Sequence, residues 1–182
     1  ECLNIALAAN KAEVTSRYFQ LATVGLDGRP ANRTMVFRDF LHDGKHTLLK
    51  TITDKRSEKI RELLANPFGS ICWYFPITRE QFRINGKVKI ALPMGENAFL
   101  EQARRKTWTD ISVKARAQFI AAGLQHKSPI EAKFLDSLPL PEEAPPTEED
   151  AVKRLNEEAL SNFCLLLLQP ERIDHLDLFK NK

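Results

Sequence analysis

The sequence has little of several features that mark specialised proteins. Its three cysteines, Cys2, Cys72 and Cys164, are widely spaced and odd in number, so neither a disulfide framework nor a zinc motif is indicated. The longest purely apolar run, Phe163 to Leu168, is too short for a membrane span or for the core of a signal peptide. From these absences we expect a cytoplasmic protein with free thiols.

An excess of one charge sign is also lacking. The 27 Lys and Arg residues and the 24 Asp and Glu residues leave a formal net charge of +3. That charge provides no general field that would attract nucleic acid or anionic lipid, so any anion site must be local. The sequence contains no G-x-S-x-G elbow, no G-x-G-x-x-G and no Walker loop. Hydrolase and P-loop chemistry therefore have no motif to support them.

What is present suits one globular protein. A chain of 182 residues can bury about 70% of the surface that it exposes when unfolded. The apolar share of 43% and the charged share of 28% are typical of soluble domains. We expect a single domain over residues 1–182, with a helical and proline-rich excursion at about 96–160 that includes the exposed loop Pro139 to Thr147.

Apolar periodicity predicts a mainly β fold. The turn signals Asp27-Gly28 and Asp43-Gly44 separate three antiparallel strands, and further strands follow a short helix whose apolar face is formed by Ile60, Leu63 and Leu64. Five strands with one inserted helix suggest a barrel with helices outside it. We expect helices at about 3–17, 54–65 and 96–122, the last divided near 107–109, and strands at 18–24, 32–40, 46–53, 70–75, 81–90, 163–168 and 172–178.

The second expected helix begins with unusual charges. Lys55, Arg56 and Lys59 lie within its first turns, together with Thr53 and Ser57. Cations at a helix N-terminus are unfavourable by about 0.3 to 1 kcal/mol each unless an anion binds there. Backbone N–H groups, hydroxyls and ammonium groups at such a junction could hold a phosphate. The alternative is a solvated basic face.

Arg33 lies within a predicted strand, where a charged side chain needs a partner. Alternation places Arg33 and Arg38 on opposite faces of that strand, so the two side chains meet different surroundings and cannot have the same role. One could face a ligand and the other solvent. The alternative for Arg33 is an ion pair with a neighbouring acid such as Asp39.

Two other clusters suggest different functions. His42 and His46, with Asp39 and Asp43, could ligate a metal, but i,i+4 spacing converges only on a helix and here a turn intervenes. We therefore expect solvated hairpin residues. The run Trp73-Tyr74-Phe75 could form a stacking platform for single-stranded nucleic acid, although strand aromatics are more often core and the cation excess is small.

Four motifs, in this order, resemble the pyridoxamine 5′-phosphate oxidase-like flavin-binding split barrels over about residues 18–180. They are Arg33-Thr-Met-Val-Phe-Arg38, Thr53-Asp-Lys-Arg-Ser-Glu-Lys59, Glu62-Leu-Leu-Ala-Asn-Pro67 and Arg79-Glu-Gln-Phe-Arg-Ile-Asn-Gly86. The resemblance implies an antiparallel split β-barrel with flanking helices. It also implies FMN as the cofactor and a homodimer with FMN at the subunit interface.

The resemblance assigns roles to individual residues. It implies that Arg33 and Lys59 hold the FMN phosphate, and that Gln81 contacts the isoalloxazine ring, whose edge carries both donors and acceptors. Backbone contacts to the ring fall on the strand from Thr34 to Phe37, and Arg38 takes the place of a lysine near the flavin. The expected cofactor-binding residues are Arg33, Thr34, Met35, Val36, Arg38, Thr53, Arg56, Ser57, Lys59 and Gln81.

One departure from the family concerns binding. The family's Ser-Arg-Lys is Ser57-Glu58-Lys59 here, so one cation is missing from the first turn. Arg56 or Lys55, one or two positions upstream, could replace it. We therefore expect FMN binding to survive.

The other departures concern catalysis. Phe99 stands where the family has a tyrosine that helps to hold pyridoxamine phosphate, and Arg104 or Arg105 is nearest to the expected substrate arginine. Leu176 replaces a late tryptophan, and the sequence ends at Lys182, before the terminal arginine elements of the oxidase. We expect a flavin oxidoreductase of open substrate; the alternatives are a flavin-binding module without turnover and a basic barrel that binds nucleic acid.

Overall fold

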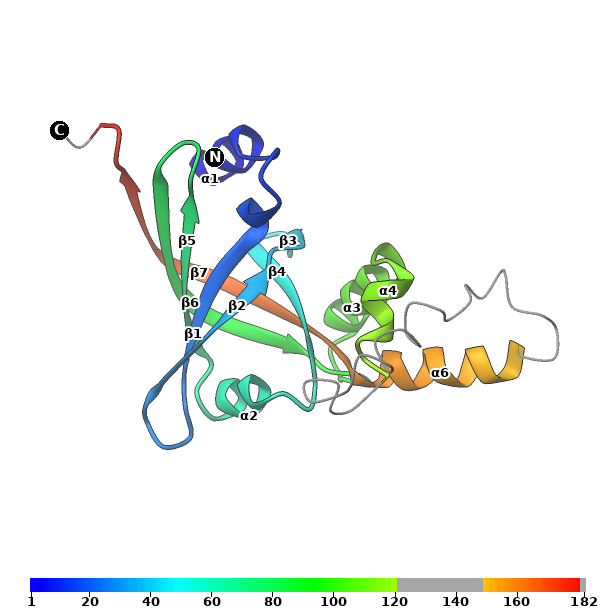
Figure 1. The fold of residues 1–182 in the computed structure, drawn as a ribbon. Helices are drawn as coiled ribbons and strands as arrows, with labels where there is room; N and C mark the ends of the chain where they lie inside the picture. Colours follow the sequence, from blue (N-terminus) through cyan, green and yellow to red (C-terminus); the bar gives the residue numbers. More distant parts are fainter. Residues whose placement is uncertain (121–148, 181–182) are drawn as a thin grey trace. The chain divides into compact units, whose positions relative to one another are not determined.

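The computed structural model describes residues 1–120 and 149–180, with side chains described throughout except at 149–155. Seven strands form one curved sheet in the order β2-β1-β5-β6-β7-β4-β3 (Figure 1). The strands are β1 Tyr18–Val24, β2 Pro30–Val36, β3 Asp39–His42, β4 Thr47–Asp54, β5 Phe68–Phe75, β6 Glu80–Ala91 and β7 Phe163–Asp177. The helices are α1 Cys2–Ala9, the 3-10 helix η1 Val14–Arg17, α2 Glu58–Ala65, α3 Ala98–Asp110, α4 Val113–Ala117 and α6 Glu149–Asn162. The predicted mainly β fold with additional helices is confirmed.

Both predicted hairpin turns form. Gly28 and Gly44 have φ angles of 80° and 88°, a left-handed conformation that side chains disfavour. In the second turn, the Asp43 carboxylate accepts hydrogen bonds from the backbone N–H groups of Lys45 and His46. The turns fix antiparallel registers for β1 with β2 and for β3 with β4.

The strand expected at 32–40 is two strands in the structure. β2 pairs with β1, whereas β3 pairs with β4 at the other end of the sheet order. The Arg17 side chain donates to the carbonyl oxygens of Phe37 and Arg38, at 3.2 and 2.8 Å. These two carbonyls are therefore satisfied outside a strand ladder, and the chain passes from one sheet edge to the other at this point.

Two helix boundaries also differ from the sequence-based expectation. α1 ends at Ala9 because the buried Asn10 side chain donates to the Ala6 carbonyl and accepts from the Ile77 N–H. The long helical segment divides at Ile111 and Ser112 rather than near 107–109, and the Ser112 side chain accepts from Ala115 N at the start of α4. The loop from Pro139 to Thr147 lies outside the described residues.

The described chain forms two compact units. One comprises Glu1–Ile52, Ser57–Ile90 and Leu165–Lys182, and the other comprises Thr53–Arg56 and Ala91–Cys164. In the first, Phe19, Trp73 and Phe75 form a buried aromatic cluster, and Trp73 Nε1 donates to the Ser16 carbonyl. Trp73 and Phe75 are thus core residues, not surfaces on which bases could stack. No helix within the described ranges is long and apolar enough to span a bilayer.

Candidate functional site

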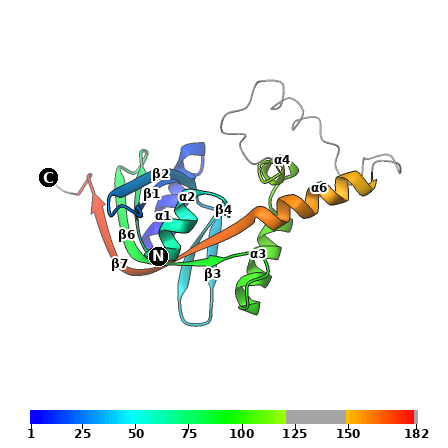
Figure 2. The ribbon, with the colours of Figure 1, turned by 90° about the horizontal axis from the view of Figure 1, so that it is seen from below.

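The start of α2 is the first element of the site. Ser57 has an extended backbone as the N-cap residue, with Glu58 in the first turn and Ile60 and Leu63 buried beneath the helix. Figures 1 and 2 place α2 at one end of the curved sheet. Leu64, expected on the apolar face, is 62% exposed, whereas Glu62 is buried. The buried face of α2 therefore contains a carboxylate.

Glu62 is the partner of Arg33. Arg33 Nη2 lies 2.7 Å from Glu62 Oε2, and the two side chains are 21% and 8% exposed. The hydroxyl of the buried Thr23 donates to the same carboxylate oxygen at 2.5 Å and accepts from Arg33 Nη1. The expected alternative, an ion pair between Arg33 and Asp39, is not formed; Asp39 accepts from its neighbour Phe40 N–H instead.

This contact brings Arg33 to the helix that carries Lys59. Lys59 and Glu62 are three residues apart on α2 and so share one face. Since Glu62 binds the Arg33 guanidinium, the two cations expected to hold a phosphate lie on the same side of α2. Lys59 and Ser57 are both half-buried.

β2 supplies the next group of expected contacts. It is the terminal strand of the sheet order, so one of its backbone edges pairs with no strand in that order. Thr34 is exposed and bonded to Gln20, whereas the Met35 side chain is in the core at 7% exposure. The Val36 carbonyl accepts from Thr51 Oγ1 at 2.8 Å. Met35 can therefore offer a cofactor only its backbone.

Arg38 follows β2 and carries an unsatisfied donor. Its Nε is buried and makes no hydrogen bond to any described residue. Burial, and to a lesser extent the nearby Arg17 charge, lowers the pKa of the Arg38 guanidinium. A buried N–H without an acceptor is costly. Flavin ring carbonyls are acceptors of the kind that this donor lacks, so Arg38 fits a flavin nearby.

Arg56 and Thr53 belong to the second compact unit. Thr53 is buried at 8% exposure. Asp54 holds Arg56 through two contacts, Nε to Oδ1 at 2.8 Å and Nη2 to Oδ2 at 2.6 Å, and these bonds raise the Arg56 pKa. Asp54 therefore pairs with Arg56, one of the two cations that could replace the one missing at Glu58; the other, Lys55, is exposed.

Gln81 points away from the Arg33 side of the sheet. Residues directly opposite each other on neighbouring strands share a face of the sheet. Across β2, β1, β5 and β6 the successive partners are Arg33, Leu21, Ile71 and Ile84, so Ile84 is on the same face as Arg33. Gln81 is three residues from Ile84 and therefore faces the other way. It also lies three strand spacings from β2, about 14 Å at the usual strand separation. The Gln81 amide makes no hydrogen bond to any described residue.

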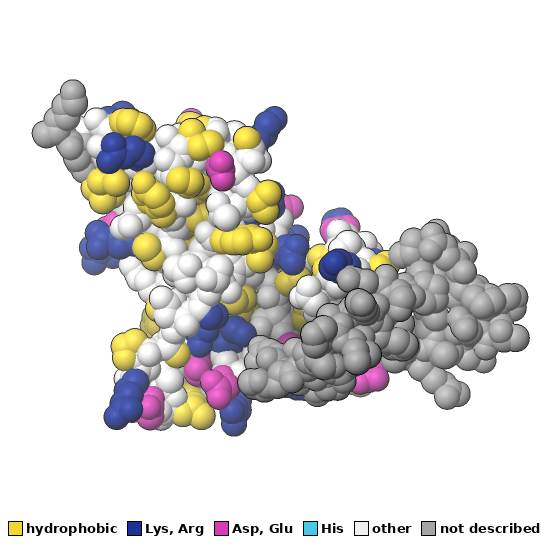
Figure 3. All heavy atoms as spheres, viewed as in Figure 1, with side chains coloured by type: hydrophobic (Ala, Val, Ile, Leu, Met, Phe, Trp, Pro, Cys, Tyr) yellow, Lys and Arg dark blue, Asp and Glu magenta, His cyan; other side chains and the backbone are white. Residues whose placement is uncertain are grey.

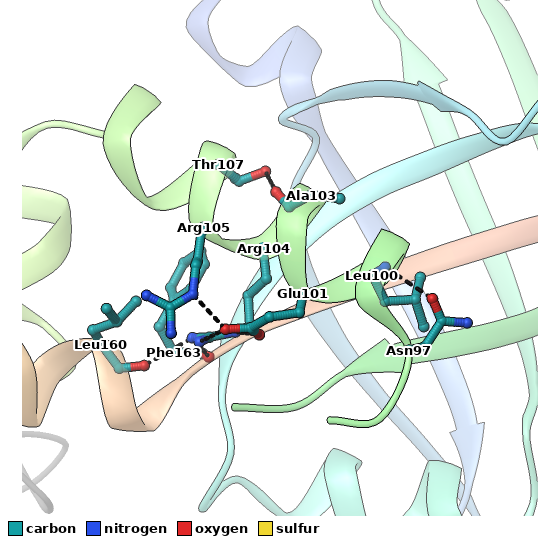
Figure 4. A network of polar contacts seen from close by, with 9 residues as sticks. All are labelled: Asn97, Leu100, Glu101, Ala103, Arg104, Arg105, Thr107, Leu160 and Phe163. Carbon is teal, nitrogen blue, oxygen red and sulfur yellow. Dashed lines mark hydrogen bonds and ion pairs between the residues drawn. The ribbon is translucent and has the colours of Figure 1, made fainter. Parts of the chain in front are cut away.

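Arg104, one of the two arginines nearest in sequence to the expected substrate arginine, is a structural residue. Its side chain is 2% exposed and contacts the Glu101 carboxylate at 2.7 and 2.9 Å (Figure 4). It also donates to the carbonyls of Leu160 and Phe163, at 2.9 and 3.1 Å. Arg105 also pairs with Glu101 but is 63% exposed. Of the two arginines, only Arg105 is open to solvent.

The histidine cluster of the β3–β4 hairpin has local partners. His42 Nδ1 lies 3.0 Å from Thr47 Oγ1, and His46 Nδ1 lies 3.4 Å from Asp43 Oδ1. Within residues 1–120 and 149–180, no three His, Cys, Asp or Glu side chains are grouped as metal ligands.

Comparisons with known proteins support the family resemblance. Residues 1–92 match the family model described as pyridoxamine 5′-phosphate oxidase, FMN-binding domain. The pyridoxine/pyridoxamine 5′-phosphate oxidase 2 of Arabidopsis thaliana is 36% identical over 181 residues, covering 97% of this chain and 81% of the plant protein.

Solved structures agree as well. A pyridoxamine 5′-phosphate oxidase-related, FMN binding protein from Nostoc punctiforme has a TM-score of 0.80 and 38% identity, covering 99% of this chain and 84% of that one. PhzG from Burkholderia lata, with a TM-score of 0.61, 24% identity and coverage of 96% and 77%, shares the fold. The split-barrel prediction is therefore confirmed. The chain belongs to the pyridoxamine 5′-phosphate oxidase family, through its FMN-binding domain.

Proposed function

We propose that this chain binds FMN and acts as a flavin-dependent oxidoreductase. The observation that carries the proposal is the Arg33–Glu62 contact, which places the Arg33 guanidinium on the face of α2 that bears Lys59. Two cations and the N–H groups of a helix start would hold the phosphate. The unsatisfied Nε of Arg38 would meet an acceptor on the ring. Bound FMN supplies hydride acceptance and electron transfer, while the protein supplies position and electrostatics.

The first experiment is a titration of purified protein with FMN, followed by absorbance and by quenching of flavin fluorescence. Protein that contains no flavin and takes up none would contradict the proposal. If FMN binds, anaerobic reduction by NAD(P)H or by pyridoxamine phosphate, then reoxidation in air, separates an enzyme from a binding module without turnover. The name of the Arabidopsis relative makes pyridoxamine phosphate the first substrate to test. Phe99, in place of the family's tyrosine, argues against it, and with Arg104 buried only Arg105 is left as a candidate for the substrate arginine.

Replacing Lys59 with alanine should weaken FMN binding by about tenfold to a hundredfold, because one charge-assisted contact of about 1.5 to 3 kcal/mol is lost. The matched control is Glu58→Arg in the same turn, which restores a cation at an exposed position and should leave the FMN dissociation constant equal or lower. An unchanged constant for Lys59→Ala would refute the assignment of Lys59. A clear loss of FMN affinity in Glu58→Arg would mean that Glu58 does not occupy the position of the family's arginine.

We further propose a homodimer in which each flavin contacts Gln81 of the partner subunit. Arg33 and Gln81 face opposite sides of the sheet of one protomer, so one flavin would contact both most simply across a subunit interface. Figure 3 shows apolar side chains gathered on one face of the sheet. Tyr18 and Tyr74, on β1 and β5, are 41% and 45% exposed and suit such an interface.

Mixing two defective variants tests this arrangement. Arg33→Ala and Gln81→Ala homodimers should each bind FMN weakly. A heterodimer formed by subunit exchange should contain one intact site and one doubly defective site, so about half of its sites should regain wild-type affinity. Light scattering on each sample confirms the dimer mass. If Arg33 and Gln81 serve the same site from one protomer, the mixture will recover no tight site.

A further inference from the structure

The Arg33 guanidinium is held at one end and open at the other. Nη1 donates to the Thr23 hydroxyl and to the carbonyls of Leu21 and Ala31, and Nη2 donates to Glu62. Thr23 Oγ1 bridges Nη1 and the Glu62 oxygen, so these bonds occupy the end that bears Nη1 and Nη2. Among the described residues, no acceptor receives a hydrogen bond from Nε. The Nε–H of Arg33 is therefore available to donate a hydrogen bond to a ligand.

Glu62 is built into the fold rather than recruited from the surface. Its side chain is 8% exposed and lies on α2, while Thr23 is 4% exposed and lies on β1. A buried carboxylate is tolerated only when it is paired and hydrogen-bonded, and here one oxygen accepts from both Arg33 and Thr23. Two different elements therefore fix the position of one guanidinium.

We propose that Glu62 and Thr23 are positioning residues that hold Arg33 with its Nε edge directed at the FMN phosphate. This inference rests on the proposed function. A free arginine side chain has many rotamers, and ordering it upon binding reduces affinity. A guanidinium ordered in advance offers its donors without that loss. Glu62 therefore acts through Arg33 and touches no ligand itself.

The opposite effect is also physically possible. Glu62 is an anion near a phosphate, and repulsion or competition for Arg33 could make it an inhibitor of FMN binding. The two roles predict opposite results when the carboxylate is removed. Glutamine separates them further, because its amide oxygen can still accept from Arg33 Nη2 without a charge.

The experiment uses fluorescence quenching to measure dissociation constants for FMN and riboflavin in three variants of this chain: Glu62→Ala, Glu62→Gln and Thr23→Val. Riboflavin lacks the phosphate, so it reports on the rest of the site. We expect Glu62→Ala to weaken FMN binding about tenfold and Thr23→Val about threefold or more, both with unchanged riboflavin affinity. Glu62→Gln should bind FMN as tightly as the wild type, or more tightly. In an Arg33→Ala background, Glu62→Ala should have no further effect.

Tighter or unchanged FMN binding by Glu62→Ala would overturn the inference, and so would equal losses for FMN and riboflavin. Should Glu62→Ala fail to fold, Thr23→Val keeps the test decisive, because valine has nearly the same shape and removes only the hydroxyl. Unchanged FMN affinity in Thr23→Val would then refute the positioning role. A wild-type protein that binds no FMN would instead contradict the proposed function itself.

Discussion

Arg33→Ala should be the most damaging single substitution in the proposed site, because it affects both binding and stability. Loss of a charge-assisted phosphate contact should weaken FMN binding about tenfold to a hundredfold. The same change leaves the Glu62 carboxylate buried at 8% exposure without its cation. Breaking a buried ion pair in this way costs about 3 to 5 kcal/mol. Urea unfolding without flavin measures the second effect separately from the first.

A double substitution separates the two consequences of Arg33→Ala. Arg33→Ala with Glu62→Gln removes the stranded charge, so much of the lost unfolding free energy should return. FMN affinity should stay low, since the phosphate still lacks its arginine. If Arg33→Ala binds FMN like the wild type, the phosphate site lies elsewhere. If it is as stable as the wild type, Glu62 is solvated more than its burial indicates.

Much of the fold was predictable because local signals set it. The turns at Asp27-Gly28 and Asp43-Gly44 and the alternation of β5 and β6 gave those strands within about two residues. The division between β2 and β3 was not predictable, because it depends on Arg17, which binds the carbonyls of Phe37 and Arg38. Nothing in the strand residues themselves marks a break caused by a side chain some 20 positions away.

The same distinction applies to the site. The motifs identified Arg33 and Lys59, but not Glu62 or Thr23, which lie 29 and 10 positions from Arg33 in the sequence. One signal was present: Glu62 is three residues from Lys59 and directly precedes the buried Leu63. An acid beside an apolar helix face suggests a buried partner. The sequence pattern predicted Leu64 on the buried face, whereas Leu64 is 62% exposed and Glu62 is buried in its stead.

Gly86→Ala should be the most destabilising substitution away from the site. Gly86 closes the last of the four motifs, and in the structure it lies where β7 passes close to β6. A Cβ at this position would be 1.9 Å from the Gln169 carbonyl oxygen and 3.1 Å from the Glu171 backbone nitrogen. Both obstacles are backbone atoms, so no side-chain rotation can relieve the clash. The two strands would have to separate.

We expect Gly86→Ala to lose about 3 kcal/mol or more of unfolding free energy, which for a chain of this size lowers Tm by about 6 to 12 °C. Gly44→Ala is the matched control, because its φ of 88° strains the backbone while no atom lies within 4 Å of the added Cβ. Strain alone costs about 1 to 2 kcal/mol. Thermal unfolding of the two variants therefore compares steric exclusion with backbone strain. Equal losses of unfolding free energy would contradict the clash, because they would show that a Cβ at position 86 does not come within 1.9 Å of the Gln169 carbonyl oxygen.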